Sequence, residues 1–189
     1  MTLPAGWAIE VLWLSWGLYW WWSSRHVKRA RRRESVASRA AHLLPLAIAA
    51  LLLAWPAAPG WLGERWLAVD ADRTWAGTVL VAAGLGLSVW ARVLLGGNWS
   101  ASVTLKEDHQ IVRAGPYRLV RHPIYTGLLL AFAGTALARG EWRGLVAFAV
   151  AAVALWRKLR IEERWLTEEF GARYADYRRQ TRALIPFIL

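Results

Sequence analysis

Residues 3–22 read LPAGWAIEVLWLSWGLYWWW, and residues 23–33 continue as SSRHVKRARRR. Twenty mainly apolar residues form about 30 Å of helix at about 1.5 Å per residue, which matches the hydrocarbon core of a membrane. A run of lysines and arginines directly after such a block is typical of the cytoplasmic side. The two stretches therefore predict a membrane helix with its N-terminus outside and its basic end in the cytoplasm.

The first block is expected to be a retained span and not a cleaved signal. It is long, begins almost at Met1, runs into arginines and lacks a small-residue cleavage pattern. Glu10 interrupts it. Because a carboxylate in the middle of a span is costly in lipid, Glu10 is expected to face another helix or an aqueous cavity. A structural contact is the favoured interpretation, and a substrate contact is the alternative.

Four further apolar blocks cover residues 43–62, 74–95, 124–138 and 144–156. Residues 23–41 and 96–122 are rich in Lys and Arg, whereas residues 63–73 hold two bases against three acids. By the positive-inside rule the first two of these segments are cytoplasmic and the third lies outside. The last two blocks span only about 20 to 23 Å each, which predicts a tight helical hairpin that need not fully cross.

These patterns predict an all-α fold, an integral membrane bundle of about five transmembrane helices. The last helix is expected to continue to Trp165, and the remainder of the chain is expected to be cytoplasmic and amphipathic. Gly84-Leu85-Gly86 lies within the third block, where small residues ease contact between helices.

The composition supports a membrane protein. Of the 189 residues 57% are apolar, yet the net charge is +11. Each basic run abuts an apolar block, so anionic lipid headgroups explain the charge and nucleic acid is not an expected partner. The absence of cysteine excludes disulfides and thiolate chemistry. No metal site is predicted, because His26, His42, His109 and His122 are scattered; the first three are expected to be ordinary surface or interfacial histidines.

The most informative stretch is GPYRLVRHPIYTG, at residues 115–127. Pro123 biases His122 away from the helical region, so a helix starts at or after the proline, and free backbone donors there can meet a polar ligand group. The cytoplasmic surface of the bilayer is then the expected position of Arg121, His122 and Tyr125. There they can contact a polar molecule on one side and an apolar molecule on the other.

A second charged stretch, RKLRIEER, covers residues 157–164. In a helix it places Arg160 and Glu163 on one face and Lys158 and Glu162 on another. Two ionised glutamates can accept hydrogen bonds from a ribose diol. The alternative is a solvated helix end, stabilised by its own i, i+4 ion pairs. Spacing leaves both interpretations open.

Together, Arg-His-Pro-x-Tyr-x-Gly at residues 121–127 and the pair Glu162-Glu163 resemble the signature of the isoprenylcysteine carboxyl methyltransferases and their bacterial and archaeal relatives. The resemblance extends over residues 96–189. It implies two parts, an N-terminal three-helix membrane region at residues 1–95 and a C-terminal methyltransferase core at residues 96–189. It also implies that the core forms a cytoplasmic pocket for S-adenosylmethionine, with a lipid-facing opening for the acceptor.

By position, the resemblance assigns cofactor contacts to seven residues: Val112, Gly115, Tyr117, His122, Tyr125, Glu162 and Glu163. It makes Arg121 and Glu163 the catalytic candidates. Arg121 suits the two-pronged grip of an acidic acceptor. A carboxylate acceptor needs no base, whereas an amine or thiol requires one, for which Glu163 or His122 is the candidate.

The predicted function is methyl transfer from S-adenosylmethionine to a small or lipophilic acceptor within reach of the bilayer, with a carboxylate favoured. Phospholipid N-methylation and thiol S-methylation are the alternatives. An NADPH-dependent lipid or sterol reductase and a non-catalytic membrane scaffold are rivals of another class. A prokaryotic inner membrane is the expected location, and the oligomeric state is left open.

Overall fold

The computed structural model describes residues 5–25, 27–28, 30–55, 58–68, 70–100, 102–106 and 110–186. The described chain is mostly helical, as predicted. Its α-helices are α1 (Ala5–Ser23), α2 (Val36–Ala54), α3 (Ala71–Leu95), α4 (Pro123–Arg139), α5 (Trp142–Phe170) and α6 (Ala172–Gln180). Short 3-10 helices are η1 (Gly60–Gly63), η2 (Gly96–Asn98) and η3 (Gly115–Arg118), and the strands are β1 (Ala30–Arg33) and β2 (Thr104–Lys106).

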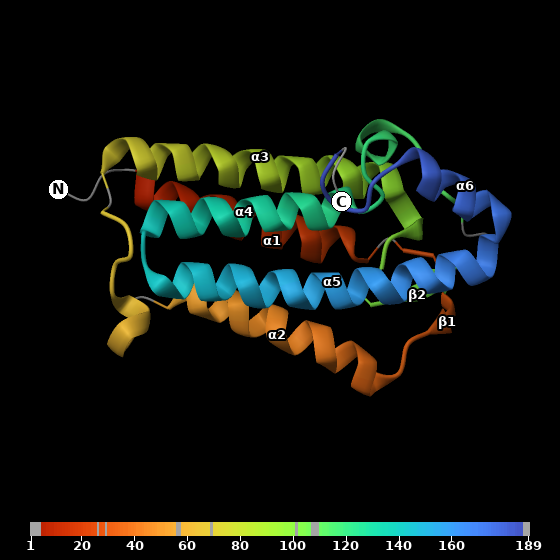
Figure 1. The fold of residues 1–189 in the computed structure, drawn as a ribbon, viewed down its shortest axis with the longest axis horizontal. Coiled ribbons are helices and arrows are strands. Elements are labelled where there is room, and N and C mark those ends of the chain that lie inside the picture. The colour runs from red at the N-terminus through yellow and green to blue at the C-terminus, as the bar shows by residue number, and fades with distance from the viewer. Residues whose placement is uncertain are drawn as a thin grey trace.

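The first five α-helices run along the long axis of the molecule (Figure 1). The chain passes from α4 to α5 through Gly140, which has a φ of +61° and ends α4 with its N–H bonded to Ala136. This is the tight hairpin that the sequence predicts. With 29 residues, α5 is about 44 Å long and reaches past its neighbours toward α6, so the predicted extension of this helix is confirmed.

Close contact between α3 and α4 depends on glycines. A Cβ atom on Gly134 would lie 2.7 Å from the Gly77 carbonyl oxygen, and one on Gly127 would lie 2.9 Å from the Ser88 nitrogen. Gly84 faces Gly127 in the same way. Small residues let two helix backbones approach each other, which is the role predicted for Gly84.

The second helix differs from its predicted bounds, 43–62. It begins at Val36 because Ser35 caps it, accepting a hydrogen bond from the Ser38 N–H at 3.1 Å. It ends at Ala54, and Trp55 is extended (ψ 127°), as expected for the residue before a proline. The later part of the predicted block contains η1 instead.

The prediction of surface histidines is wrong for His42, which is fully buried. Its Nε2 lies 3.3 Å from Oε1 of Glu34, and that same oxygen accepts the Val103 N–H at 2.9 Å. This polar cluster fixes the segment before β2 to the start of α2. His26 and His109 lie outside the described residues.

Two short strands modify the all-α prediction. Strands β1 and β2 pair antiparallel, with Arg33 opposite Thr104. Both segments are predicted as cytoplasmic loops, because neither has the alternating pattern of a half-buried strand. The pairing joins segments about 70 positions apart at the end of the bundle that also holds α6 (Figure 1).

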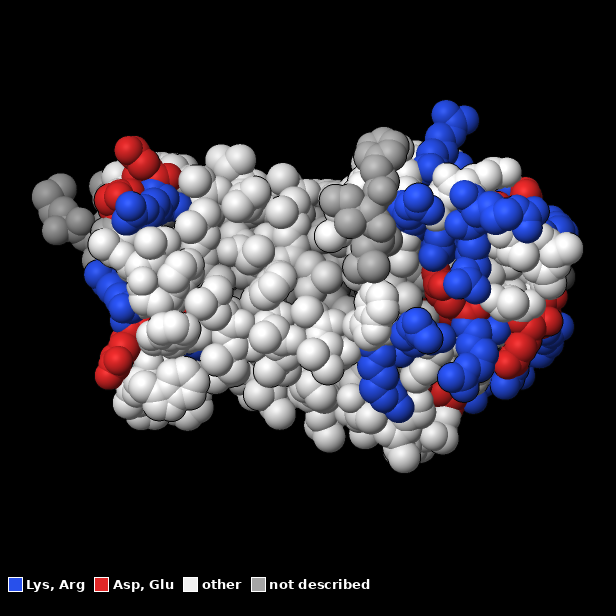
Figure 2. Space-filling model, viewed as in Figure 1, with Lys and Arg blue, Asp and Glu red and all other residues white. Residues whose placement is uncertain are grey.

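The outer face of the bundle is apolar. On α2, Leu44, Ile48 and Leu51 are 62%, 53% and 63% exposed and recur at helical spacing. Two segments, Val36–Ala54 and Ala71–Asn98, are long and apolar enough to cross a membrane. Figure 2 shows an uncharged middle with the charged residues at the two ends. Such a surface fits lipid, because soluble proteins rarely expose apolar patches of this extent.

Glu10 has a partner on another helix. One of its carboxylate oxygens lies 3.8 Å from Nη2 of Arg139. Both residues line a cavity of about 430 Å³ between α1, α2 and α4, so the carboxylate has a partner on another helix as predicted, while its side chain is still 70% exposed.

Candidate active site

The GPYRLVRHPIYTG stretch forms η3, a short extended connection and the start of α4. Pro123 is the first residue of α4 and His122 precedes it with a non-helical backbone (φ −123°), as predicted. The connection is held from the other end of the chain: the N–H groups of Arg121 and His122 donate to the carbonyls of Arg182 and Ala183 at 2.8 and 3.0 Å. The returning C-terminal segment thereby fixes the position of both side chains.

The two charged motifs meet at this point. Tyr125 donates its hydroxyl proton to Oε1 of Glu162 at 2.7 Å, and Arg121 donates its Nε proton to Oε1 of Glu163 at 2.6 Å. The His122 ring lies between the glutamates, with Nδ1 3.5 Å from Glu162 and Nε2 3.4 Å from Glu163. The glutamates are therefore more than a solvated helix end, although Lys158 also lies 3.8 Å from Glu162 in an i, i+4 pair.

The electrostatics of this cluster favour its charged form. Burial alone would lower the pKa of His122, but hydrogen bonds and charges from Glu162 and Glu163 outweigh burial and raise the pKa above its usual value. Burial opposes ionisation of Glu163, yet His122 and Arg121 lower the pKa of its carboxyl to about 2. The pKa of Glu162 is also lowered, against its burial, mainly by Lys158 and His122. Both glutamates are thus anionic at neutral pH.

A cavity of about 120 Å³ opens beside the cluster. Its walls come from η2 and the segment after it, β2, η3, the start of α4 and α5. Tyr117, Arg121, His122, Tyr125 and Glu162 line it, so five of the predicted site residues share one cavity.

Two cavity-lining residues carry polar atoms that lack a partner. Oδ1 of Asn98 and Oγ1 of Thr104 are buried and make no hydrogen bond within the described ranges. A buried polar atom left unpaired is costly unless a ligand satisfies it. Both residues lie within 96–189, the part of the chain that resembles the methyltransferase family, but neither was predicted as a site residue. These atoms, with the Glu162 carboxylate, suit a cofactor rich in hydroxyl and amino groups.

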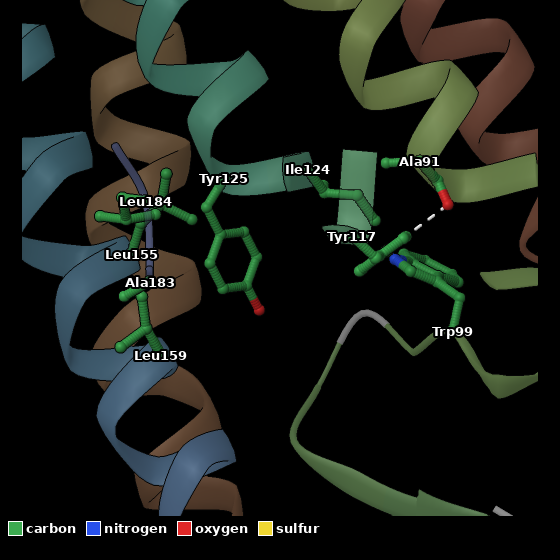
Figure 3. Packing of buried hydrophobic residues seen from close by; sticks show 9 residues of the cluster. All are labelled: Ala91, Trp99, Tyr117, Ile124, Tyr125, Leu155, Leu159, Ala183 and Leu184. Carbon is green, nitrogen blue, oxygen red and sulfur yellow. Dashed lines mark hydrogen bonds between the residues drawn. The ribbon is translucent and has the colours of Figure 1, made fainter. Parts of the chain in front are cut away.

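Packing holds the lining residues rigidly. Figure 3 shows the ring of Tyr125 between Leu155 and Leu159 of α5 on one side and Tyr117 with Trp99 on the other. The Tyr117 hydroxyl donates to the carbonyl oxygen of Ala91 on α3 at 3.3 Å. Tyr117 therefore presents its ring to the cavity, while its polar group is used structurally.

Three predicted site residues lie outside the cavity lining: Val112, Gly115 and Glu163. Val112 is partly buried against the apolar cluster around Tyr117. Gly115 has a φ of +55°, and a Cβ atom there would lie 2.5 Å from Leu94 of α3. Their assignment as cofactor contacts stays a prediction, and the geometry gives Gly115 a conformational role in the turn.

The C-terminal segment makes further contacts that were not predicted from the sequence. Nε of Arg178 lies 3.4 Å from Oε2 of Glu163, and the Thr181 carbonyl accepts a hydrogen bond from Nη1 of Arg121. The Tyr177 hydroxyl donates to the Tyr117 carbonyl at 2.7 Å. The repeated tyrosines after Phe170 were the sequence signal for such contacts, but their spacing does not indicate which residues they contact.

An apolar helical bundle with a pocket built from distant segments at its charged end is the architecture of a membrane protein. Residues 72–173 match the phospholipid methyltransferase family. Because this match covers more than half of the chain, the protein belongs to that family.

The chain is similar to several proteins that are named as methyltransferases. Protein-S-isoprenylcysteine O-methyltransferase B of Arabidopsis thaliana is 28% identical over 118 residues, 59% of this chain and 58% of the relative. The Saccharomyces cerevisiae protein-S-isoprenylcysteine O-methyltransferase is 34% identical over 118 residues, 59% of this chain and 48% of the relative.

A bacterial relative is more similar over a shorter stretch. Methanethiol S-methyltransferase 2 of Bradyrhizobium diazoefficiens is 46% identical over 72 residues, 37% of this chain and 26% of the relative. The chain thus spans about half the length of the isoprenylcysteine O-methyltransferases, and less of the methanethiol enzyme.

Proposed function

We propose that this protein is a membrane methyltransferase that uses S-adenosylmethionine and acts on a lipophilic or small acceptor. The observation that carries the proposal is the meeting of His122, Tyr125 and Arg121 with Glu162 and Glu163 beside one cavity. The names of the relatives, O- and S-methyltransferases, support the same reaction class.

Glu162, Asn98 and Thr104 are the residues that we propose hold the cofactor. The carboxylate accepts hydrogen bonds from hydroxyl groups, and the unpartnered oxygens of Asn98 and Thr104 accept from amino or hydroxyl groups. The bound cofactor would supply an electrophilic methyl group. Trp165 and Leu166 also line the cavity and exclude water from it.

A carboxylate is the acceptor that the site supports best. Glu163, whose pKa is lowered to about 2, is a weak base, and the two carboxylates beside His122 raise the pKa of its ring and so favour its protonated form. An amine or thiol acceptor has to lose a proton, whereas a carboxylate is already ionised at neutral pH. The chemistry therefore reduces to positioning two reactants.

Arg121 is the residue that we propose orients this carboxylate. Its Nε and Nη1 are engaged by Glu163 and the Thr181 carbonyl, while its Nη2 has no partner among the residues that the structure describes. Two parallel hydrogen bonds from Arg121 to the acceptor carboxylate would require Nη1 to release the Thr181 carbonyl. A single hydrogen bond from Nη2 is therefore the simpler arrangement.

We further propose that the bundle crosses the membrane about five times, with the site facing the cytoplasm. The charged end that holds α6, β1 and β2 contains the arginine-rich segments, and short basic loops face the cytoplasm. A prokaryotic inner membrane fits the bacterial relative, whereas the plant and yeast relatives leave other membranes open.

Calorimetry of the purified protein separates this proposal from its rivals. A methyltransferase binds S-adenosylhomocysteine and not NADPH, a reductase gives the opposite result, and a scaffold binds neither. Transfer of tritiated methyl groups into prenyl-cysteine, thiol and phospholipid pools then identifies the acceptor. Transfer confined to phospholipid or thiol would exclude the carboxylate.

A further inference from the structure

A second cleft also borders Arg121, on the side opposite the cavity of about 120 Å³ that we propose holds the cofactor. It has a volume of about 570 Å³ and is formed by α5, α6 and residues 181–183. We call it the arginine cleft, because its charged lining consists of five arginines and one glutamate: Arg121, Arg160, Arg178, Arg179, Arg182 and Glu163. Among the residues that the structure describes, Arg121 alone lines both cavities.

The charges of the arginine cleft do not balance. Glu163 is already shared between Arg121 and Arg178, and Arg179 pairs with Asp176 at 3.0 Å. Arg160 and Arg182 pair with no carboxylate in the described part of the chain. A cleft lined by one sign of charge concentrates ions of the opposite sign, so the arginine cleft attracts an anion.

The cleft lies where α5 changes from apolar to charged. Trp156 lines it one turn before Arg160 and is 39% exposed. Val153, a further three residues earlier on the same helical face, is 71% exposed. Tryptophan is enriched at the depth of lipid headgroups, and an exposed valine beyond it suits acyl chains. In Figure 2 the arginines and lysines gather directly beside the uncharged middle of the molecule.

We propose that the arginine cleft binds the phosphate of an anionic phospholipid, with the acyl chains lying along α5 toward Val153. Guanidinium groups bind phosphate through paired hydrogen bonds, and Arg160 and Arg182 are available to do so. A free phosphate would use the same groups but gains nothing from Trp156 and Val153. The proposal requires the apolar surface to lie in lipid and does not depend on methyl transfer.

The test measures lipid binding by the purified protein in uncharged detergent. Phosphatidylglycerol is expected to form one-to-one adducts in native mass spectra and to raise the thermal unfolding midpoint. Its affinity should fall with added salt, since exposed charges are screened. In the variant Arg160→Gln/Arg182→Gln the affinity should fall at least tenfold. The matched control Arg164→Gln/Arg173→Gln removes two exposed arginines outside the cleft and should change affinity less than twofold.

Two comparison ligands decide the source of the anion. Phosphatidylcholine and inorganic phosphate should each bind at least tenfold more weakly than phosphatidylglycerol. Equal binding of phosphatidylcholine, equal stabilisation by inorganic phosphate, or equal losses in the two double variants would each overturn the proposal.

The variant Arg160→Lys/Arg182→Lys covers the case in which the glutamine variant fails to fold. It keeps both charges and loses the planar fork, so it should bind phosphatidylglycerol with intermediate affinity. Wild-type affinity in a folded lysine variant would overturn the role of the guanidinium groups. Because the readout is lipid binding, loss of methyl transfer or of S-adenosylhomocysteine binding leaves this result unaffected.

Discussion

Nε of Arg121 lies 2.6 Å from Oε1 of Glu163, and this ion pair connects the start of α4 to the charged part of α5 across 42 positions of sequence. Both side chains are about nine-tenths buried. Removing one member of such a pair leaves a buried charge without its partner. The pair therefore has a structural role as well as the functional one proposed above.

We predict that Glu163→Gln and Arg121→Gln each destabilise the protein by about 3 kcal/mol, with a coupling energy of about 1 to 3 kcal/mol in the double variant. The control is Glu168→Gln, which breaks an ion pair with Arg32 whose side chains are both 49% exposed. Such a pair contributes less than about 1 kcal/mol. Thermal unfolding in detergent measures all four variants, and additive effects of the first two would refute the coupling.

Arg121→Lys tests acceptor handling. Lysine keeps the charge near Glu163 but loses the planar fork, including the Nη2 group that we assign to the acceptor. Turnover should fall at least tenfold while S-adenosylhomocysteine affinity changes less than threefold. Equal losses in both measurements would mean that Arg121 acts on the cofactor site as a whole.

Glu162→Gln tests the cofactor site. The carboxylate lines the cavity and accepts a hydrogen bond from Tyr125, so its loss removes an acceptor for the cofactor. Calorimetry should show S-adenosylhomocysteine affinity reduced by about 1.5 to 3 kcal/mol, the range for a hydrogen bond to a charged group. Glu168→Gln is the matched control on the same helix. Affinity within twofold of the wild type would remove Glu162 from the site.

The raised pKa of His122 predicts a pH dependence of stability. A histidine whose folded pKa lies above its unfolded value of about 6.5 contributes stability that is fully present below pH 6.5. That contribution is lost as the pH rises through the folded pKa. The unfolding midpoint of the wild type should therefore fall as the pH rises above about 6.5, and His122→Gln should show a flatter profile. Parallel profiles would contradict a protonated His122.

The local pattern of apolar and turn-forming residues was sufficient to predict most of the helices. The apolar blocks at 74–95, 124–138 and 144–156 correspond to α3, α4 and the first part of α5, because hydrophobic length and the turn formers around Gly140 act locally. The start of α2 was missed because it depends on a polar cap at Ser35, before the apolar block begins.

Only some of the contacts between distant segments could be predicted from the sequence. The motifs indicated that His122 and Glu162 belong to one site, and the structure brings them together. Nothing in the spacing indicated that Arg178 would reach Glu163, or that Thr104 would leave a buried oxygen facing the cavity. Both depend on how the C-terminal segment and the β1–β2 pair fold back on the bundle, which only the tertiary structure defines.

The cavity volume predicts that cofactor binding moves the segments around it. About 120 Å³ is below the range of about 300 to 1,000 Å³ typical of ligand pockets. The walls at residues 98–104 therefore have to shift outward and then order on the ligand. Hydrogen exchange with S-adenosylhomocysteine should show protection at residues 98–104, 121–125 and 160–166. Protection confined to α1 and α2 would place the cofactor elsewhere.

The proposed topology predicts opposite labelling of the two ends of the bundle. Val36 at the start of α2 is 79% exposed at the end with the basic segments, and Asp72 is exposed at the start of α3, in the part that we assign to the outside. Because the chain contains no cysteine, Val36→Cys and Asp72→Cys each introduce a single thiol. Short loops rich in Lys and Arg are retained in the cytoplasm, so the thiol at position 36 should react with an impermeant maleimide only after permeabilisation. The thiol at position 72 should react in intact cells. The reverse pattern would invert the topology, and labelling of both thiols in intact cells would show that α2 does not carry the chain across as proposed.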